Sequence, residues 1–245
     1  MVKWIPYVIT KKDMRPQFSS DMQYENWIAG QLRTKKIMKV RKGLYVLADV
    51  TGEPMATQFE IASKIADDAF LCYHSALEFY GAANQVFHTV TVGSKSRFNP
   101  FTFLDVDYIR KQPKNDYGIA YIEQAGVRVT TLERTVIDCI DDIDACGGID
   151  ELLGALGQIR ILDEKELLGA LNAYNCVLLY QKAGYILQHY QEKFSLSDAF
   201  FTECKRHLTR QVKYFLKDEY GEVEYNSEWR LMAPKNLIAR IGGGY

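Results

Sequence analysis

The chain has 245 residues, of which 47% are hydrophobic and 25% charged, and its formal net charge is −1. These values place it in the ordinary soluble globular class. No apolar run approaches the ~18 residues needed to span a bilayer, so we expect no membrane partner. The start has no signal-peptide pattern, and the five cysteines form no CxxC pair, so a reduced, cytoplasmic protein without a metal site is expected.

The charge is distributed unevenly along the chain. Residues 1–48 carry ten lysines and arginines against three carboxylates, a charge of +7, while the other 20 cations and 28 carboxylates leave −8 on the remainder. A compact basic module joined to an acidic body is the distribution expected when one end of a protein contacts phosphate groups. Taken alone, the asymmetry also fits a solvated charged face.

The basic segment begins with the signals of two consecutive helices. Thr10 is a suitable N-cap for a short helix that Pro16 would end, and Ser19 and Ser20 offer a second cap. A helical apolar pattern then starts at Asp21. Its members are Met22, Tyr24, Trp27, Ile28 and Leu32.

A basic hairpin is expected next. Two short β-prone runs flank Arg41-Lys42-Gly43, with the glycine at the turn, and Thr51-Gly52-Glu53-Pro54 is the strongest boundary signal in the chain. The order helix, turn, helix, hairpin predicts a winged-helix DNA-binding domain over residues 1–50. Residues 55–245 are expected to form an α+β body.

The body is expected to mix helices and strands first and to become helical in its last third. The expected strands are Phe87–Gly93, Phe101–Arg110, Ile119–Glu123 and Val127–Thr130. The expected helices are one or two over Thr57–Tyr80, one opening at Thr131 and broken by Cys146-Gly147-Gly148, and four over Gly148–Gln158, Asp163–Tyr174, Val177–Gln191 and Ser197–Arg210. Leu208–Tyr225 is expected to be strand or loop. The fold class predicted is therefore α/β of the α+β type, with an N-terminal winged helix-turn-helix.

A helix-turn-helix binds DNA by placing its second helix in the major groove. Gln and Asn side chains near the start of that helix can each pair bidentately with adenine, and the hairpin can bring Arg41 into the adjacent minor groove. The expected DNA contacts are Lys11, Lys12, Ser19, Ser20, Gln23, Tyr24, Asn26, Arg33, Lys35, Lys36, Lys39, Arg41 and Lys42. A charged helical cap, or a winged helix that binds protein, is the alternative left open.

Several motifs, in consistent order, resemble the AbiEi family of type IV antitoxins. The wing of that family is similar to Lys39-Val40-Arg41-Lys42-Gly43-Leu44-Tyr45. The later matches are Tyr73-His74-Ser75-Ala76-Leu77 with Tyr80-Gly81, the segment Val129–Asp138, Gly147-Gly148, and Gln181-Lys182-Ala183-Gly184-Tyr185. The resemblance runs from about Ile9 to Phe200. The first helix of the winged helix is shortened, and the tail after Phe200 matches nothing in the family.

The resemblance implies a regulator of transcription that represses its own operon by binding double-stranded DNA at operator repeats. It further implies that the same operon encodes a nucleotidyltransferase-type toxin. This toxin is expected to be a functional partner, which the C-terminal domain counters without stable contact. No reaction and no cofactor are expected.

One enzymatic hypothesis competes with DNA binding. Gly93-Ser94 followed by Asp105 and Asp107 has the spacing of a metal-dependent nucleotidyltransferase, in which Gly-Ser holds a triphosphate and the aspartates hold Mg²⁺. That chemistry needs a helix beginning at Gly-Ser, whereas the following residues, with Pro100, predict a loop leading into a strand. Arg134 and Asp138, four residues apart on a helix, are interpreted as a buried ion pair rather than an acid-base set.

Overall fold

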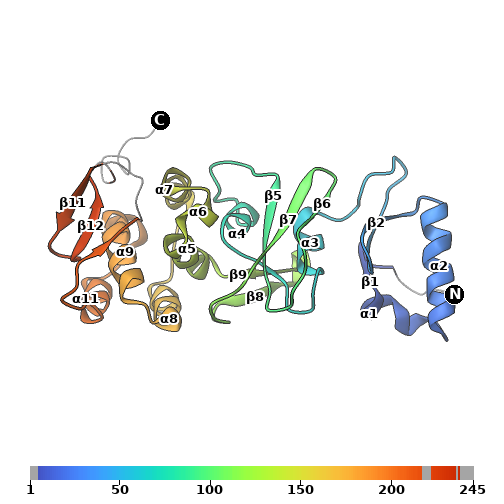
Figure 1. The fold of residues 1–245 in the computed structure, drawn as a ribbon, viewed down its shortest axis with the longest axis horizontal. Helices are drawn as coiled ribbons and strands as arrows, with labels where there is room; N and C mark the ends of the chain where they lie inside the picture. The colour runs from blue at the N-terminus through green and yellow to red at the C-terminus, as the bar shows by residue number, and fades with distance from the viewer. Residues whose placement is uncertain (1–4, 217–221, 236, 238–245) are drawn as a thin grey trace. The chain divides into compact units, whose positions relative to one another are not determined.

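The computed structural model describes residues 5–216, 222–235 and 237, and it confirms a mixed α/β fold of the α+β type (Figure 1). The chain divides into two compact units. The first comprises residues 1–71, 87–112 and 121–129, and the second comprises residues 72–86, 113–120 and 130–245. The division expected after residue 50 stays a prediction.

The basic N-terminal segment of the first unit forms two helices and a three-stranded sheet. Its elements are β1 (Val8–Thr10), α1 (Lys11–Met14), the 3-10 turn η1 (Arg15–Gln17), α2 (Asp21–Arg33), β2 (Ile37–Arg41) and β3 (Leu44–Leu47). The strands pair antiparallel in the order β1-β3-β2. The expected caps are confirmed, because the hydroxyl of Thr10 accepts from the amide of Asp13 and that of Ser20 from the amide of Gln23.

A small hydrophobic core holds this segment together. It contains Ile9, Met14, Tyr24, Ile28 and Ile37, with Phe18, Trp27 and Leu32 packed against it. The expectation that Met22 joins this core is wrong, since 73% of it is exposed. At about 100° per residue, Met22 lies about 200° around the helix from Tyr24 and therefore faces the opposite side.

The middle of the chain forms a six-stranded mixed sheet in the order β6-β7-β5-β4-β9-β8. The strands are β4 (Phe70–Leu71), β5 (Thr89–Gly93), β6 (Phe101–Phe103), β7 (Val106–Lys111), β8 (Ile119–Ile122) and β9 (Val127–Thr130). β4 pairs parallel with β9 and β5 with β7, whereas β4 with β5 and β6 with β7 are antiparallel.

Two expectations for this region are corrected. Thr57–Tyr80 contains not only the helices α3 (Gln58–Ser63) and α4 (His74–Phe79) but also β4 between them. A short apolar run that is buried on both faces does not alternate, so periodicity cannot separate it from a helix. The single strand expected over Phe101–Arg110 is a hairpin, because Leu104 and Asp105 both adopt positive φ and turn the chain.

The second unit is mainly helical, as expected. Its helices include α5 (Leu132–Asp141), the short α6 (Ile143–Cys146), α7 (Ile149–Gln158), α8 (Glu164–Tyr174), α9 (Val177–Leu187) and α11 (Asp198–Arg206). The 3-10 helix η3 (Gln188–Tyr190) and the short helix α10 (Gln191–Phe194) follow α9. The helix opening at Thr131 ends at Asp141, and the expected break at Gly147 ends α6 instead.

A three-stranded sheet closes the second unit, in the order β10-β12-β11. Its strands are β10 (Lys213–Tyr214), β11 (Val223–Asn226) and β12 (Leu231–Pro234). Trp229, which is fully buried, packs this sheet against α9. Its ring lies so close to Gly184 that a Cβ atom at this position would be 2.1 Å from the ring. The tail at residues 241–245 lies outside the described residues.

Candidate nucleic-acid interface

Residues 33–42 of the N-terminal segment contain five exposed cations. No carboxylate occurs between Glu25 and Asp49, and in the part of the chain that the structure describes none of the five has a carboxylate partner. They are Arg33, Lys35, Lys36, Lys39 and Lys42, and we call them the free basic patch. Because α2 contacts β2, the end of the helix, the following turn and the hairpin belong to one region of the first unit (Figure 1).

The two lysines of α1 differ from the free basic patch, because each forms an ion pair with a carboxylate. Lys11 lies 3.1 Å from Asp21, which also accepts a hydrogen bond from Arg15. The hydrogen bond from Arg15, followed by that from Lys11, lowers the pKa of Asp21. Lys12 lies 2.9 Å from Asp67 of the same unit. Lys11 and Lys12, both expected to contact DNA, therefore have carboxylates beside them that partly neutralise their charge.

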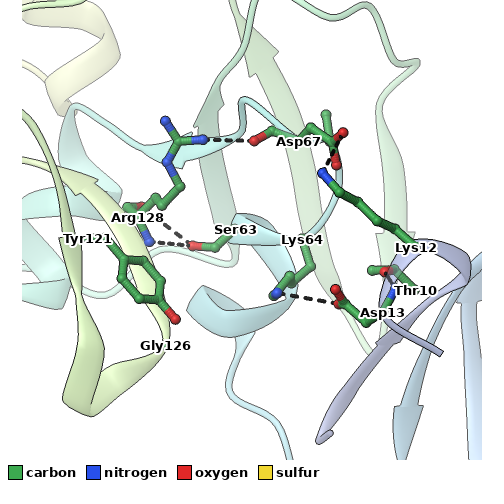
Figure 2. A pocket seen from close by; sticks show the side chains of 10 residues that line it. Thr10, Lys12, Asp13, Ser63, Lys64, Asp67, Tyr121, Gly126 and Arg128 are labelled. Atoms are coloured by element: carbon green, nitrogen blue, oxygen red, sulfur yellow. Dashed lines mark hydrogen bonds and ion pairs between the residues drawn. The ribbon is translucent and has the colours of Figure 1, made fainter. Parts of the chain in front are cut away.

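A shallow hollow separates α1 from α3 and β9 (Figure 2). Lys64 of α3 pairs with Asp13 at 3.4 Å, and Arg128 donates to the carbonyl oxygen of Asp67 at 2.8 Å. Together with the Lys12 pair, these contacts give each charged side chain that lines the hollow a partner in the protein. The hollow is thus a polar junction within the first unit and adds no free cation to the patch.

One face of α2 is exposed from its first turn to its last. Met22, Asn26, Ala29 and Arg33 are exposed at spacings of four, three and four residues, so they follow one face of the helix. The amide of Asn26 has no partner among the described residues. Small Ala29 would let the helix axis approach a groove closely. This face, ending in Arg33, has the shape and polarity that groove contact needs.

Four of the other residues expected to contact DNA, namely Ser19, Ser20, Gln23 and Tyr24, have structural roles. The hydroxyl of Ser19 donates to Gln23 at 2.6 Å, and Ser20 caps α2, so the start of the helix is held by its own side chains. Tyr24 is corrected: it is 4% exposed and belongs to the core, because it falls four residues before Ile28 on the inner face. It is not available to a DNA base.

Arg41 is also corrected. Its guanidinium carbon lies 5.6 Å from the ring centroid of Phe98 and 5.3 Å from that of Phe101, and one of its terminal nitrogens is buried. Stacking on aromatic rings is a favourable use of arginine within a protein. The side chain therefore packs inside the first unit rather than projecting toward a minor groove. Sequence gave no signal for this, since the two rings lie more than fifty residues further along the chain.

The Gly93-Ser94 pair is not followed by a helix in the described chain, which stays irregular up to β6. The Asp68 carboxylate accepts hydrogen bonds from the Ser94 hydroxyl at 2.8 Å and from the amides of Lys95 and Ser96 at 2.6 and 3.1 Å. The amides that a phosphate would need are thus directed at a carboxylate of this chain.

The aspartates of the same hypothesis lie on a hairpin. Asp105 occupies the turn between β6 and β7, and Asp107 of β7 accepts from the hydroxyl of Thr102 at 2.5 Å. Across the described residues, no three or more His, Cys, Asp or Glu side chains are grouped so that they could hold a metal ion. The helix N-terminus that the nucleotidyltransferase hypothesis requires is missing from this part of the chain.

Asp68 provides a pH-dependent prediction. Partial burial raises the pKa of Asp68, but the hydrogen bonds from Ser94 and Ser96 outweigh it and lower the value to about 2. The ionised form therefore stabilises the fold fully above the unfolded pKa of about 3.9, and this contribution is lost as the pH falls from there toward 2. In urea unfolding, Asp68→Asn should be less stable than wild type at pH 6, and the difference should shrink between pH 4 and pH 2. A difference that stays constant would contradict this assignment.

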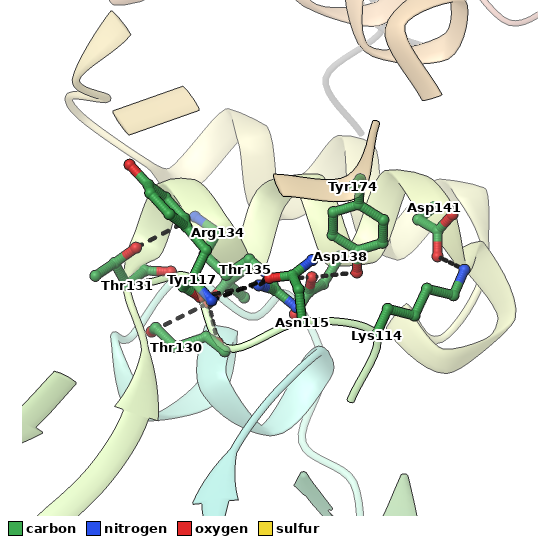
Figure 3. Close-up of polar contacts among 10 residues, drawn as sticks. All are labelled: Lys114, Asn115, Tyr117, Thr130, Thr131, Arg134, Thr135, Asp138, Asp141 and Tyr174. Atoms are coloured by element: carbon green, nitrogen blue, oxygen red, sulfur yellow. Dashed lines mark hydrogen bonds and ion pairs between the residues drawn. The ribbon is translucent and has the colours of Figure 1, made fainter. Parts of the chain in front are cut away.

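A buried polar network lies in the second unit (Figure 3). Arg134 of α5, 2% exposed, donates to Asp138, to the side chain of Asn115 and to the carbonyl oxygen of Tyr117, the last at 2.9 Å. The hydroxyl of Tyr174 donates to Asp138 at 2.5 Å. Burial raises the pKa of Asp138 to about 6, although Arg134 and Tyr174 act in the opposite direction. The network joins α5, α8 and the 113–120 segment. The contact between Arg134 and Asp138 confirms the predicted buried ion pair.

The buried histidine has a comparable structural role. His74 of α4 lies 3.2 Å from Glu151 of α7, and Glu151 also accepts the amide hydrogens of Asn84 and Gln85 at 2.7 and 3.2 Å. Desolvation lowers the pKa of His74, although the Glu151 carboxylate opposes that change. These contacts fix the loop after α4 against α7.

Comparison with family models and with curated proteins gives no match. Among solved structures, the fold is similar to the crystal structure of RV2827C protein from Mycobacterium tuberculosis, with a TM-score of 0.62 and 14% sequence identity. The similarity covers 96% of this chain and 88% of that one, so nearly the whole fold is shared. Within the described residues, no helix is both long enough and apolar enough to cross a membrane.

Proposed function

We propose that this protein is a DNA-binding regulator of transcription, with α2 in the major groove and the β2–β3 hairpin beside it as a wing. The free basic patch is the observation that carries the proposal. Five cations with no carboxylate partner among the described residues, on one short segment of an otherwise acidic chain, favour a polyanionic partner. The helix, turn, helix and hairpin order agrees with the winged-helix interpretation.

Within this proposal the contacts divide by role. Lys35, Lys36, Lys39 and Lys42 neutralise phosphates and set the position of the protein on the duplex. Asn26 and Met22 lie on the exposed face of α2, where an amide can pair with adenine and a thioether can contact a thymine methyl group. Specificity would thus come from two side chains of the helix and affinity mainly from the patch.

The proposal is tested by fluorescence anisotropy of the full chain with a labelled duplex taken from upstream of its own coding sequence. Four phosphate contacts predict a slope of about −3.6 for the logarithm of the binding constant against that of salt concentration. A slope near zero, or no binding at 50 mM salt, would refute DNA binding and favour the protein-binding alternative.

Asn26→Ala should change sequence preference rather than salt dependence. Losing a bidentate amide-to-base pair costs about 1–3 kcal/mol at one base position, while the phosphate contacts stay. Competition with duplexes varied one base pair at a time should show a single position losing its preference. The exposed neighbour Glu25→Gln is a suitable control, and an equal loss at that position in both variants would argue against contact by Asn26.

The regulated genes follow from the resemblance to AbiEi antitoxins. We place the protein in the cytoplasm, as repressor of an operon that also encodes a nucleotidyltransferase-type toxin. The cysteines, all free thiols, agree with a reducing compartment. A reading frame of that type directly beside this gene would support the assignment, and its absence from the operon would oppose it.

A further inference from the structure

The loop between β5 and β6, residues 94–100, is fixed at its start by hydrogen bonds. The Asp68 carboxylate accepts from the Ser94 hydroxyl and from the next two backbone amides. Arg110 of β7 donates to the carbonyl oxygen of Ser96 at 3.0 Å. The first half of the loop therefore has a defined conformation before any ligand is bound.

The second half of the same loop is fixed to the β2–β3 hairpin. The guanidinium carbon of Arg41, at the end of β2, lies 5.6 Å from the centroid of the Phe98 ring and 5.3 Å from that of Phe101. The Phe101 ring in turn stacks on Tyr108 of β7, with 4.9 Å between the centroids. Both segments belong to the first unit, so Arg41 joins the end of the hairpin to the six-stranded sheet within one compact body.

Arg97 lies on this loop between the two fixed points. It is exposed, and it has no partner among the described residues. No carboxylate occurs in the sequence between Glu78 and Asp105, so the loop is basic. The next residue, Phe98, is one of the two rings in contact with Arg41, and this contact places Arg97 near the hairpin end of the free basic patch.

We infer that the loop at residues 94–100 is a second DNA-binding element, in which Arg97 contacts a phosphate of the duplex beyond the wing. The inference rests on the proposed binding of α2 and the hairpin to DNA, and it extends the interface from the winged helix to the six-stranded sheet. A guanidinium group on a fixed loop matches phosphate oxygens with its planar fork, and little backbone freedom is lost on binding. Arg41 is then a positioning residue, which aligns Arg97 with the wing.

The partner that fits this loop is the duplex already bound at the wing. A single exposed cation holds a free phosphate ion only weakly, because water competes for both charges. A duplex bound by the free basic patch instead presents one phosphate about every 3.4 Å along each strand, at high effective concentration. Arg97 therefore needs no enclosed pocket to contribute to binding.

Arg97→Ala tests this contact by anisotropy titrations of the full chain between 50 and 300 mM salt, with the duplex from upstream of its coding sequence. A fifth phosphate contact makes the wild-type slope about −4.5, instead of the −3.6 or so expected from the patch alone. The variant should return the slope to about −3.6 and lose about fivefold in affinity at 0.15 M salt. Arg160→Ala, which removes an exposed arginine of the second unit, is the matched control and should leave the slope unchanged.

The outcomes separate this inference from the proposed function. An unchanged slope in Arg97→Ala, with wild-type binding intact, overturns the second element and leaves DNA binding by the winged helix standing. Equal changes in Arg97→Ala and Arg160→Ala also overturn it, since only net charge would then matter. Failure of the wild-type protein to bind the duplex overturns both proposals.

Hydroxyl-radical cleavage of the bound duplex locates the contact. Arg97→Ala should lose protection on one flank of the site, while the protection given by α2 stays. Asn26→Ala should keep that flank protected, because it changes base preference and not the backbone contacts. A footprint of the same length in wild type and Arg97→Ala would refute the inference.

A double-mutant cycle tests the positioning role of Arg41. If Arg41 acts through Arg97, Arg41→Ala should reduce the slope by about 0.9, and adding it to Arg97→Ala should reduce the slope no further. A purely structural role of Arg41 would leave the slope of the folded variant unchanged. Additive losses, about 1.8 in total, would mean that Arg41 itself contacts a phosphate, and they would overturn its assignment as a positioning residue.

Discussion

Asp138→Ala should destabilise the protein by about 3–5 kcal/mol, the range observed when one member of a buried ion pair is removed. Arg134 is 2% exposed and would remain charged without its carboxylate, while the hydroxyl of Tyr174 would lose its acceptor. Denaturant unfolding at pH 7.5, where Asp138 with its pKa of about 6 is ionised, measures the loss. A loss below 1 kcal/mol would mean that solvent reaches this site in the folded protein.

The double variant Arg134→Met with Asp138→Leu is the control for this prediction. It removes both charges, so the cost of an unpaired arginine disappears, while the hydrogen bonds of Arg134 to Asn115 and Tyr117 and that of Tyr174 to Asp138 are given up. We therefore expect the double variant to be more stable than Asp138→Ala alone. The opposite order would show that the pair itself, rather than the penalty of breaking it, determines stability.

Local chemistry made most of the N-terminal segment predictable. Thr10, Ser20 and Gly43 act through backbone contacts a few residues away, so caps and turn could be located from short windows of sequence. The later helices were predictable for a similar reason, because an amphipathic pattern repeats along each of them. β4 was not predictable, since a two-residue strand buried on both faces has no period.

The sequence predicted which segment of the chain carries the candidate site, but not which of its cations are available to a ligand. The sequence placed Arg33, Arg41 and the six lysines of residues 11–42 in one group of DNA contacts, whereas the described structure separates the cations that have partners in the protein from those that have no carboxylate partner among the described residues. The partners of Lys12 and Arg41 are Asp67, Phe98 and Phe101, which only the tertiary fold brings near.

The free basic patch gives the prediction with the largest expected effect on function. Lys39→Ala with Lys42→Ala should reduce the salt slope of DNA binding by about 2, because each lysine that contacts a phosphate contributes about one unit. At 0.15 M salt the same two contacts correspond to an affinity loss of about 30-fold. Both side chains are exposed and neither has a partner among the described residues, so the fold should be unaffected.

Lys11→Ala with Lys12→Ala is the matched control, since it changes the net charge by the same amount within the same segment. These lysines already face Asp21 and Asp67, so their removal should reduce the slope by less than 1. Anisotropy titrations of both variants between 50 and 300 mM salt distinguish contact from long-range attraction. Equal changes in slope would mean that only the overall charge matters, and an unchanged slope in the Lys39 and Lys42 variant would remove the hairpin from the interface.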